Sequence, residues 1–175
     1  MKKIIALSLA CLVAASAAFA LDPITGTVEI NTTINESAQM NVNKKAVTSG
    51  ELSATDFTAQ ALVDKSVFGD TFYVNTRSNL GKGFSLSYTV SPLASSDANN
   101  PDKIAIVIGS KADSGAEVLT DVTAKTTVNV LATSTTTGME NHSVAIRIKA
   151  KSATWKTDVR ADSYSSDLTF TFTAN

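Results

Sequence analysis

Strict alternation of apolar and polar residues recurs from one end of this chain to the other. Two segments show it most clearly: GFSLSYTV, with Phe84, Leu86, Tyr88 and Val90 on one side, and DLTFTFTAN, with Leu168, Phe170 and Phe172. Because successive side chains of a β-strand point to opposite faces, each segment is predicted to be a strand with one buried face. No segment shows the sustained 3.6-residue period of an amphipathic helix. The chain is therefore predicted to be all-β.

Clusters of turn-forming residues separate these segments from further candidate strands. The clusters are SNLGKG, SSDANNPD, KADSGAE and TSTTTGMEN. The other candidate strands are KIAIVIGS, TTVNVLA, SVAIRIKA and VFGDTFYVN, the last with a bulge or tight bend at Gly69–Asp70. The segment Thr55–Asp64 allows a short helical turn. Short strands at this spacing, rich in Thr and Val, favour an immunoglobulin-like antiparallel β-sandwich. No repeat, Pro-rich linker or charge block divides the chain, so one domain is predicted.

Residues 1–20 have the pattern of a secretory signal peptide. The two lysines of MKK form a charged start, IIALSLACLV is an apolar run, and AFA is a small-x-small cleavage site. The apolar run is shorter than the roughly 20 residues that a membrane-spanning helix needs. Cleavage would remove Cys11, the one cysteine of the chain, so residues 21–175 would fold without a disulfide. We expect an exported protein that is not itself inserted in a membrane.

The charge balance and the scarcity of catalytic residues argue against two classes of function, nucleic-acid binding and catalysis. The chain has 15 Lys and Arg residues against 16 Asp and Glu, without the basic stripe that nucleic-acid binding requires. His142 is the only histidine and is expected in an exposed loop, so one chain offers neither a His-based triad nor a multi-histidine metal site. No nucleophile elbow or glycine-rich phosphate loop occurs. The sequence indicates a non-enzymatic protein without a cofactor.

Two local sequence patterns are compatible with a bound ligand. The loop Asp97–Asp102, DANNPD, gathers the oxygen ligands that calcium prefers, but the same residues are typical of ordinary β-turns. Trp155 and Tyr164 could together stack on a sugar, although a single tryptophan in a β-protein more often packs within the fold. Neither pattern by itself selects a ligand.

The first segment after the predicted cleavage site alternates as regularly as any later strand. In LDPITGTVEINTTINESAQM, one side carries Ile24, Gly26, Val28, Ile30, Thr32 and Ile34. Together with the signal peptide, the predicted strands and the terminal SYSSDLTFTFTAN, this resembles the subunits of adhesive fimbriae that bacteria build by the chaperone-usher pathway. Many of these pilins have a cysteine pair and a penultimate tyrosine, whereas here Ala174 is penultimate. The resemblance is therefore to disulfide-free branches, such as enterotoxigenic colonisation fimbriae.

The resemblance implies a specific mode of assembly. In this family the immunoglobulin-like subunit lacks its last strand, and the resulting groove is filled first by a periplasmic chaperone and then by the next subunit's N-terminal extension. By analogy, residues 21–36 are the extension, the six alternating residues above are its donor side chains, and 37–175 is the pilin domain. The expected acceptor-groove and chaperone contacts are Leu168, Phe170, Phe172 and, through its carboxylate, Asn175. Main-chain hydrogen bonds would give affinity, and side-chain pockets specificity.

The resemblance leads us to expect a structural subunit, the major shaft pilin of a cell-surface fimbria that is exported through the periplasm. Its expected partners are other pilin subunits, the periplasmic chaperone, the outer-membrane usher and a host-cell receptor. A self-contained secreted or periplasmic binding module, for example for carbohydrate, is the alternative, in which the segment from Ile24 to Ile34 pairs within its own sheet. An enzyme is a third alternative, which no motif supports.

Overall fold

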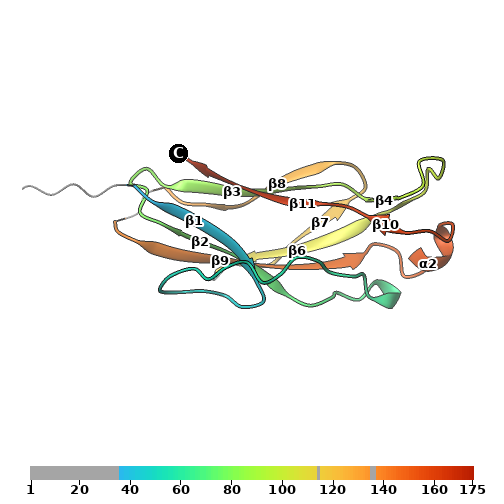
Figure 1. Cartoon of the computed structure of the whole chain (residues 1–175), viewed down its shortest axis with the longest axis horizontal. Coiled ribbons are helices and arrows are strands. Elements are labelled where there is room, and N and C mark those ends of the chain that lie inside the picture. Colours follow the sequence, from blue (N-terminus) through green and yellow to red (C-terminus); the bar gives the residue numbers. More distant parts are fainter. Residues whose placement is uncertain (1–35, 114, 135–136) are drawn as a thin grey trace, which may run out of the picture. The chain divides into compact units, whose positions relative to one another are not determined.

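The computed structural model describes residues 36–113, 115–134 and 137–175, and it contains two β-sheets packed face to face (Figure 1). Neighbouring strands within each sheet run antiparallel. The predicted all-β sandwich is confirmed, and the two clearest alternating segments both form strands in it. The predicted donor residues, from Ile24 to Ile34, lie outside the described residues.

Within the described part of the chain, the larger sheet has the strand order β1 (Ala38–Asn43), β2 (Phe72–Ser78), β9 (Glu140–Ala150), β6 (Ile106–Ala112) and β7 (Val118–Val122). The facing sheet has the order β11 (Leu168–Ala174), β3 (Phe84–Val90) and β8 (Thr126–Ala132). A small third sheet joins β10 (Tyr164–Ser165), β4 (Leu93–Ser95) and β5 (Lys103–Ile104). The short helical elements are η1 (Asp64–Ser66) and α2 (Trp155–Asp158). None of the described helices is long and apolar enough to cross a membrane.

The core is built from alternate residues of both sheets. The strand register aligns the apolar side chains of β2 and β9, pairing Val74 with Val144 and Phe72 with Ile146. The core side chains without exposed surface include Val74, Ile108, Val122, Val144 and Ile146 from the larger sheet and Phe84, Leu86 and Tyr88 from the facing sheet. Each buried side chain of this size contributes about 1.5 to 3 kcal/mol, so the sandwich is held by apolar packing.

The strand order follows the immunoglobulin arrangement with one position empty. In that arrangement successive strands A to G form one sheet of A, B, E and D and a second of C, F and G. Here β1, β2, β9 and β6 take the positions A, B, E and D, while β3 and β11 take C and F. Strands β7 and β8 extend the two sheets on their other sides. Among the described residues, no strand lies beside the outer edge of β11, where strand G belongs.

One end of the sandwich, which we call the terminal pole, holds the start of β1, the β2–β3 turn and the end of β11. The Asn79 N–H donates to Ser37 O at 3.1 Å, and the Asn175 N–H donates to Gly83 O at 3.1 Å. Gly83 has φ +79°, and a Cβ there would lie 2.2 Å from Thr133 O, so this turn requires glycine. The opposite end, with α2 and the small sheet, is the distal pole (Figure 1).

A buried asparagine fastens the chain after β1 to the outer face of the larger sheet. Asn75 has no exposed surface. Its Nδ2 donates to Asn41 Oδ1 at 3.0 Å and to Lys45 O at 3.2 Å, and its Oδ1 accepts from the Val47 N–H at 2.9 Å and from Ser143 Oγ at 2.6 Å. All four hydrogen-bonding positions of the amide are therefore used. The network holds edge strand β1 against β2.

Two segments before β3 differ from the sequence expectations. The segment VFGDTFYVN was predicted to be one strand with a bulge or tight bend at Gly69–Asp70, but β2 begins only at Phe72. The preceding Gly69 N–H donates to Ile148 O at 2.9 Å outside the regular ladder. No helix forms between Thr55 and Val63, and η1 begins at Asp64. Tertiary hydrogen bonds to the edge of β1 decide the path of this segment, which local composition could not reveal.

We predict that Asn75→Ala lowers the free energy of unfolding by about 3 kcal/mol, because four hydrogen bonds of a buried amide are lost, two of them to the buried side chains of Asn41 and Ser143. Denaturant unfolding of the variant and the parent measures the loss. Asn129→Ala, on the exposed face of β8, is the matched control and should change stability by less than about 0.5 kcal/mol. Equal effects of the two substitutions would contradict the role of the network.

Candidate functional site

In the described part of the chain, β1 is an edge strand with backbone groups that point away from the sheet. Asn79 donates to Ser37 O just before β1, and the register places these two residues opposite each other. Because hydrogen-bonded pairs alternate along an antiparallel ladder, the backbone groups of Ala38, Met40 and Val42 point away from β2. Their side chains lie on the core-facing side, where Val42 packs against the buried cluster. Both features favour pairing with a further strand.

β11 is the corresponding edge of the facing sheet. The Asn175 N–H donates to Gly83 O, so the same alternation applies along the β3–β11 ladder. The residues whose backbone groups point away from β3 are Leu168, Phe170, Phe172 and Ala174. The first three also turn their side chains inward, opposite Val90, Tyr88 and Leu86 of β3, and remain half-buried. Among the described residues, β11 therefore presents apolar side chains and unpaired backbone groups along its outer edge.

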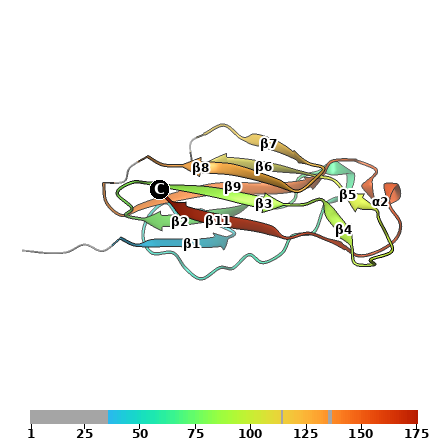
Figure 2. The same ribbon diagram turned by 90° about the horizontal axis from the view of Figure 1, so that it is seen from above.

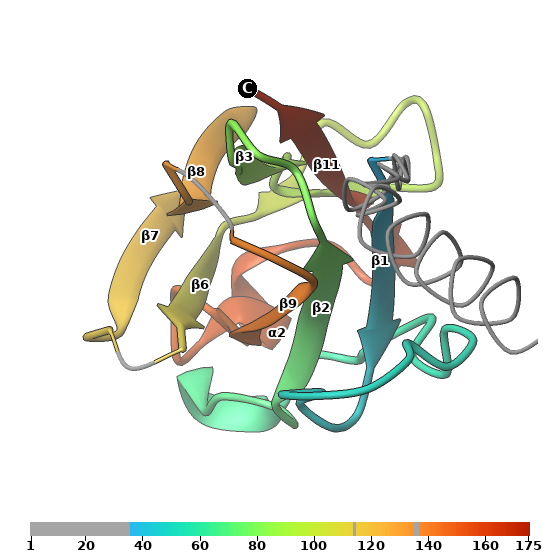
Figure 3. The ribbon, with the colours of Figure 1, turned by 90° about the vertical axis from the view of Figure 1, so that its left-hand side faces the viewer.

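β1 and β11 border the same side of the sandwich (Figures 2 and 3), and they are edge strands of different sheets. A cavity of about 270 Å³ lies at the distal end of the space between them. Its lining residues are Val42, Phe57, Thr58, Ala59, Gln60, Phe72, Ile148, Ser166, Asp167, Leu168 and Phe170. We call the whole space between the free edges of β1 and β11 the edge groove. It occupies the position that strand G would take.

Aromatic rings form much of the groove wall. Phe170 meets Phe72 edge to face, with ring centroids 6.5 Å apart, and it meets Tyr88 in the same way at 6.3 Å. Phe172 stacks on Phe84 with centroids 4.5 Å apart. The structure thus brings Leu168, Phe170 and Phe172 together along one wall, whereas Asn175 lies at the terminal pole. An apolar wall of this kind binds side chains mainly by excluding water.

In the terminal half of the edge groove, β1 contributes a partly exposed methionine and β2 contributes polar side chains. Met40 faces the other sheet from β1, yet 39% of its surface is exposed. Thr76 and Ser78 of β2 are fully buried, and their hydroxyl groups have no hydrogen-bond partner in the described part of the chain. Buried hydroxyls without a partner are destabilising, by about 1 to 3 kcal/mol each. This half therefore has an exposed apolar side chain on β1 and buried hydroxyl groups without a described partner on β2.

His142 is not the exposed loop residue that was predicted. It lies in β9 opposite Thr76, and 19% of its side chain is exposed. Its Nδ1 is 2.8 Å from Asp113 Oδ2, and its ring lies edge to face with Phe84 at 5.7 Å. The apolar alternation of β9 begins at Val144, two residues later, which hid the strand's true start in the sequence. His142 supports the terminal half of the groove wall through Phe84.

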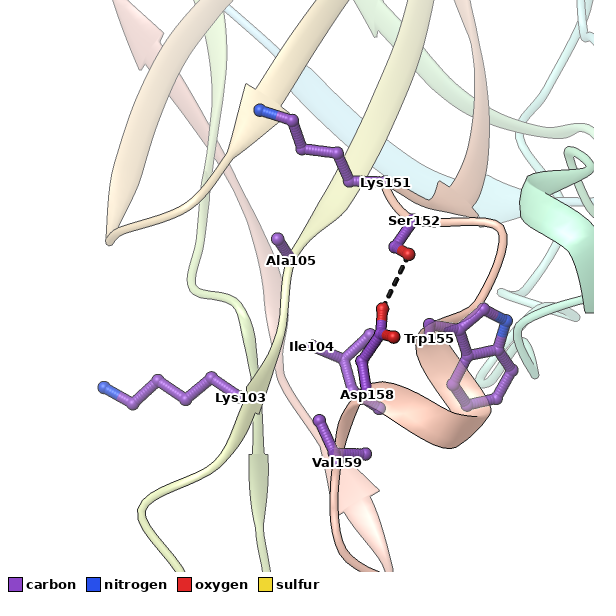
Figure 4. A pocket seen from close by; sticks show the side chains of 8 residues that line it. All are labelled: Lys103, Ile104, Ala105, Lys151, Ser152, Trp155, Asp158 and Val159. Carbon is purple, nitrogen blue, oxygen red and sulfur yellow. Dashed lines mark hydrogen bonds between the residues drawn. The ribbon is translucent and has the colours of Figure 1, made fainter.

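A second hollow, of about 340 Å³, lies beside α2 at the distal pole (Figure 4). Ser152 Oγ donates to Asp158 Oδ2 at 2.7 Å, and the amino groups of Lys103 and Lys151 point away from the hollow (Figure 4). Its charged groups therefore do not converge on one ligand position. No ring contact joins Trp155 to Tyr164 among the described residues, so the sugar-stacking pair is not assembled.

The loop Asp97–Asp102 forms turn hydrogen bonds. The Asn99 N–H donates to Asp97 Oδ1 at 2.9 Å, and the Asp102 N–H donates to Asn100 Oδ1 at 3.1 Å. These are the local side-chain bonds of turn-forming residues. Within the described ranges, no three His, Cys, Asp or Glu residues are grouped so that they could hold a metal ion.

Comparison with known proteins identifies no relative. No protein family, curated protein or solved structure is detectably similar to this chain. The site is therefore interpreted from its own geometry.

Sequence reasoning identified the β11 side of the edge groove but missed the rest. Val42 could have been found, because Met40 and Val42 alternate with asparagines in AQMNVN. Phe57 and Phe72 had no such signal, since Phe57 lies outside any strand and Phe72 begins one. Their part in the groove arises from chain segments that meet only in the folded protein.

Asp162 gives a testable pH dependence at the distal pole. Hydrogen bonds from Ser95 Oγ, the Ser163 N–H, Asn100 and Ser96 lower the pKa of its carboxyl to about 2, from 3.8. A lowered pKa means that the ionised group stabilises the fold above about pH 4, and that this contribution is lost as the pH falls towards 2. We predict that Asp162→Asn lowers the melting temperature at pH 6 but has little effect at pH 2.

Melting curves between pH 2 and 7 measure this difference. Asp70→Asn is the control, because the Asp70 side chain is exposed and its carboxylate has no hydrogen-bond partner in the described part of the chain. A difference between parent and Asp162→Asn that stays constant from pH 6 to pH 2 would contradict the assignment.

Proposed function

We propose that this chain is a structural subunit of a surface fimbria and that it polymerises by donating its N-terminal extension to the edge groove of a neighbouring copy. The observation that carries the proposal is the pair of edge strands, β1 and β11, which flank a groove with an aromatic wall at the position of strand G. A strand inserted there would pair with backbone groups on both sides and cover the exposed apolar wall.

The extension supplies a suitable occupant. Ile24, Val28, Ile30 and Ile34 share one face of an alternating segment and can enter an apolar groove together. Burial of four such side chains contributes about 6 to 12 kcal/mol before ordering costs. A typical domain has a total stability of about 5 to 15 kcal/mol. Insertion would therefore make a large difference to the subunit and give a polymer that dissociates slowly.

The positions of the termini favour one direction of insertion. Only Asn35, Glu36 and Ser37 separate Ile34 from β1, a span of about 10 Å. β11 runs from the distal pole to the terminal pole. A donated strand antiparallel to β11 runs the other way, so its C-terminal end leaves the acceptor at the distal pole. The terminal pole of the donor subunit then follows directly. The same contact then repeats from head to tail. In the opposite direction two terminal poles would meet and obstruct the acceptor's own extension, so growth would stop.

The proposed assembly also implies further protein partners and a location at the cell surface. A chain with an open apolar groove would aggregate in the periplasm, so a chaperone that fills the groove and an outer-membrane usher that exchanges it are the expected partners. The single described sandwich fits a shaft subunit of a cell-surface fimbria. In the alternative binding module, the extension would fold back into its own groove and the protein would remain a monomer.

We predict that Ile30→Asp blocks assembly without preventing export, because a carboxylate cannot enter the apolar groove without a large desolvation cost. Electron microscopy of the cell surface and immunoblots of the periplasm measure the two effects. Asn31→Asp adds the same charge on the opposite side of the extension and should leave assembly intact. Normal fibres from Ile30→Asp would refute the donor role.

We predict that a second substitution distinguishes the donor role of a subunit from its acceptor role. Leu168→Glu places a charge on the groove wall, so this variant can donate its extension but cannot accept one. Ile30→Asp has the reverse defect. Each variant alone should stay monomeric, and an equimolar mixture should form dimers and stop there, as light scattering would show. Monomers throughout, including with the parent protein, would favour the self-contained module.

A further inference from the structure

The chain's own segment Thr55–Gln60 covers part of the edge groove on the β1 side. The Val42 N–H donates to Thr55 Oγ1 at 3.3 Å, and Val42 O accepts from the N–H groups of Asp56 and Phe57 at 3.2 and 3.3 Å. Both outward-pointing backbone groups of Val42 are therefore already used. Ala38 and Met40, the other two outward-pointing residues of β1, have no such cover in the described part of the chain.

The ring of Phe57 anchors this segment in the groove. It stacks on Phe72 with centroids 4.3 Å apart and an interplanar angle of 12°. Phe72 is 3% exposed and meets Phe170 of the opposite wall. Three residues further on, Gln60 Nε2 donates to Asp70 O at 3.0 Å. The segment is thus attached by its backbone to β1, by an aromatic ring to the core and by an amide to the chain before β2.

We propose that Thr55–Gln60 is a built-in stop that sets the register of the inserted strand, an inference that rests on the proposed function. A strand that lies between β1 and β11 and leaves at the distal pole can pair with Ala38 and Met40 but runs beside an occupied edge at Val42. Its inward side chain at this level meets Phe57, so a small one is favoured there. The inserted strand therefore stays at one depth, although β11 by itself would allow several.

A defined depth matters because the donor side chains are unequal. Gly26 and Thr32 alternate with isoleucine and valine on the inward face of the extension. A slip of two residues keeps the same face inward but moves each small or polar side chain into a position shaped for a larger one. The stop at Phe57 selects one match between groove and extension, and so makes Phe57 a specificity-determining residue of the acceptor.

Cysteine cross-linking can read this register directly. Residues 21–175 contain no cysteine, so introduced thiols are unique in the exported protein. Full-length protein carrying Phe172→Cys is mixed with protein carrying a cysteine at Val28, Ile30 or Thr32 in turn. Neighbouring positions on paired strands lie close enough for a disulfide, and non-reducing gels report which mixture forms one between chains. We expect one dominant donor position.

The same mixtures are then repeated with Phe57→Ala in the acceptor. Without the ring, a larger inward side chain fits at this level, so the strand shifts towards the distal pole and the dominant donor position moves by two residues towards the N-terminus. Leu62→Ala is the matched control, because Leu62 also packs against the core but does not line the groove, and it should leave the position unchanged. Thr55→Val, which removes the bond to the Val42 N–H and keeps the side-chain size, should broaden the cross-linking to two positions.

The outcomes separate the two proposals. If the dominant donor position in both Phe57→Ala and Thr55→Val is the same as in the parent protein, the proposed stop is wrong, although strand donation is supported. If Phe57→Ala does not fold, Thr55→Val alone decides, and an unchanged single position overturns the stop. Absence of any cross-link between chains, in the parent as well as the variants, overturns the proposed function itself.

Discussion

The open pairing capacity of two edge strands dominates this structure. Strands β1 and β11 each have outward-facing backbone groups on the same residues whose side chains face the core. A polypeptide cannot leave such an edge open without exposing apolar surface as well, because inward side chain and outward backbone belong to one residue. Closing the groove with one further strand satisfies both needs together, and this is why assembly and folding are linked in the proposed function.

Other parts of the fold keep that edge in place. The buried amide of Asn75 fastens the chain after β1 to the outer face of its sheet, so β1 is held although only one of its sides is paired within a sheet. The same chain then turns around and brings Phe57 to the free side of β1. One loop thus supports the edge strand from outside and limits access to it from inside. The cavity in the groove lies at its distal half, where Phe57 lines it.

Prediction from sequence worked where the information was local. Leu168, Phe170 and Phe172 were recognised as a shared face because their period of two belongs to the strand itself. Phe57 was not, because its place depends on backbone bonds to Val42 and on a ring contact with Phe72, which lie 15 residues away on either side of it in sequence. His142 was misplaced for a related reason, since its strand begins before the apolar pattern does.

The sequence by itself determined that the chain forms strands and which side chains share a face, because the direction of a side chain on a strand follows from its position in the chain. Only the tertiary structure decided which strands are neighbours, and hence that in the described part of the chain β1 and β11 are edge strands on the same side of the sandwich. The alternation of apolar and polar residues along a strand does not determine which strands lie beside it in the sheet. The order of the strands follows from the packing of two sheets around one core, in which every strand's partner depends on all the others.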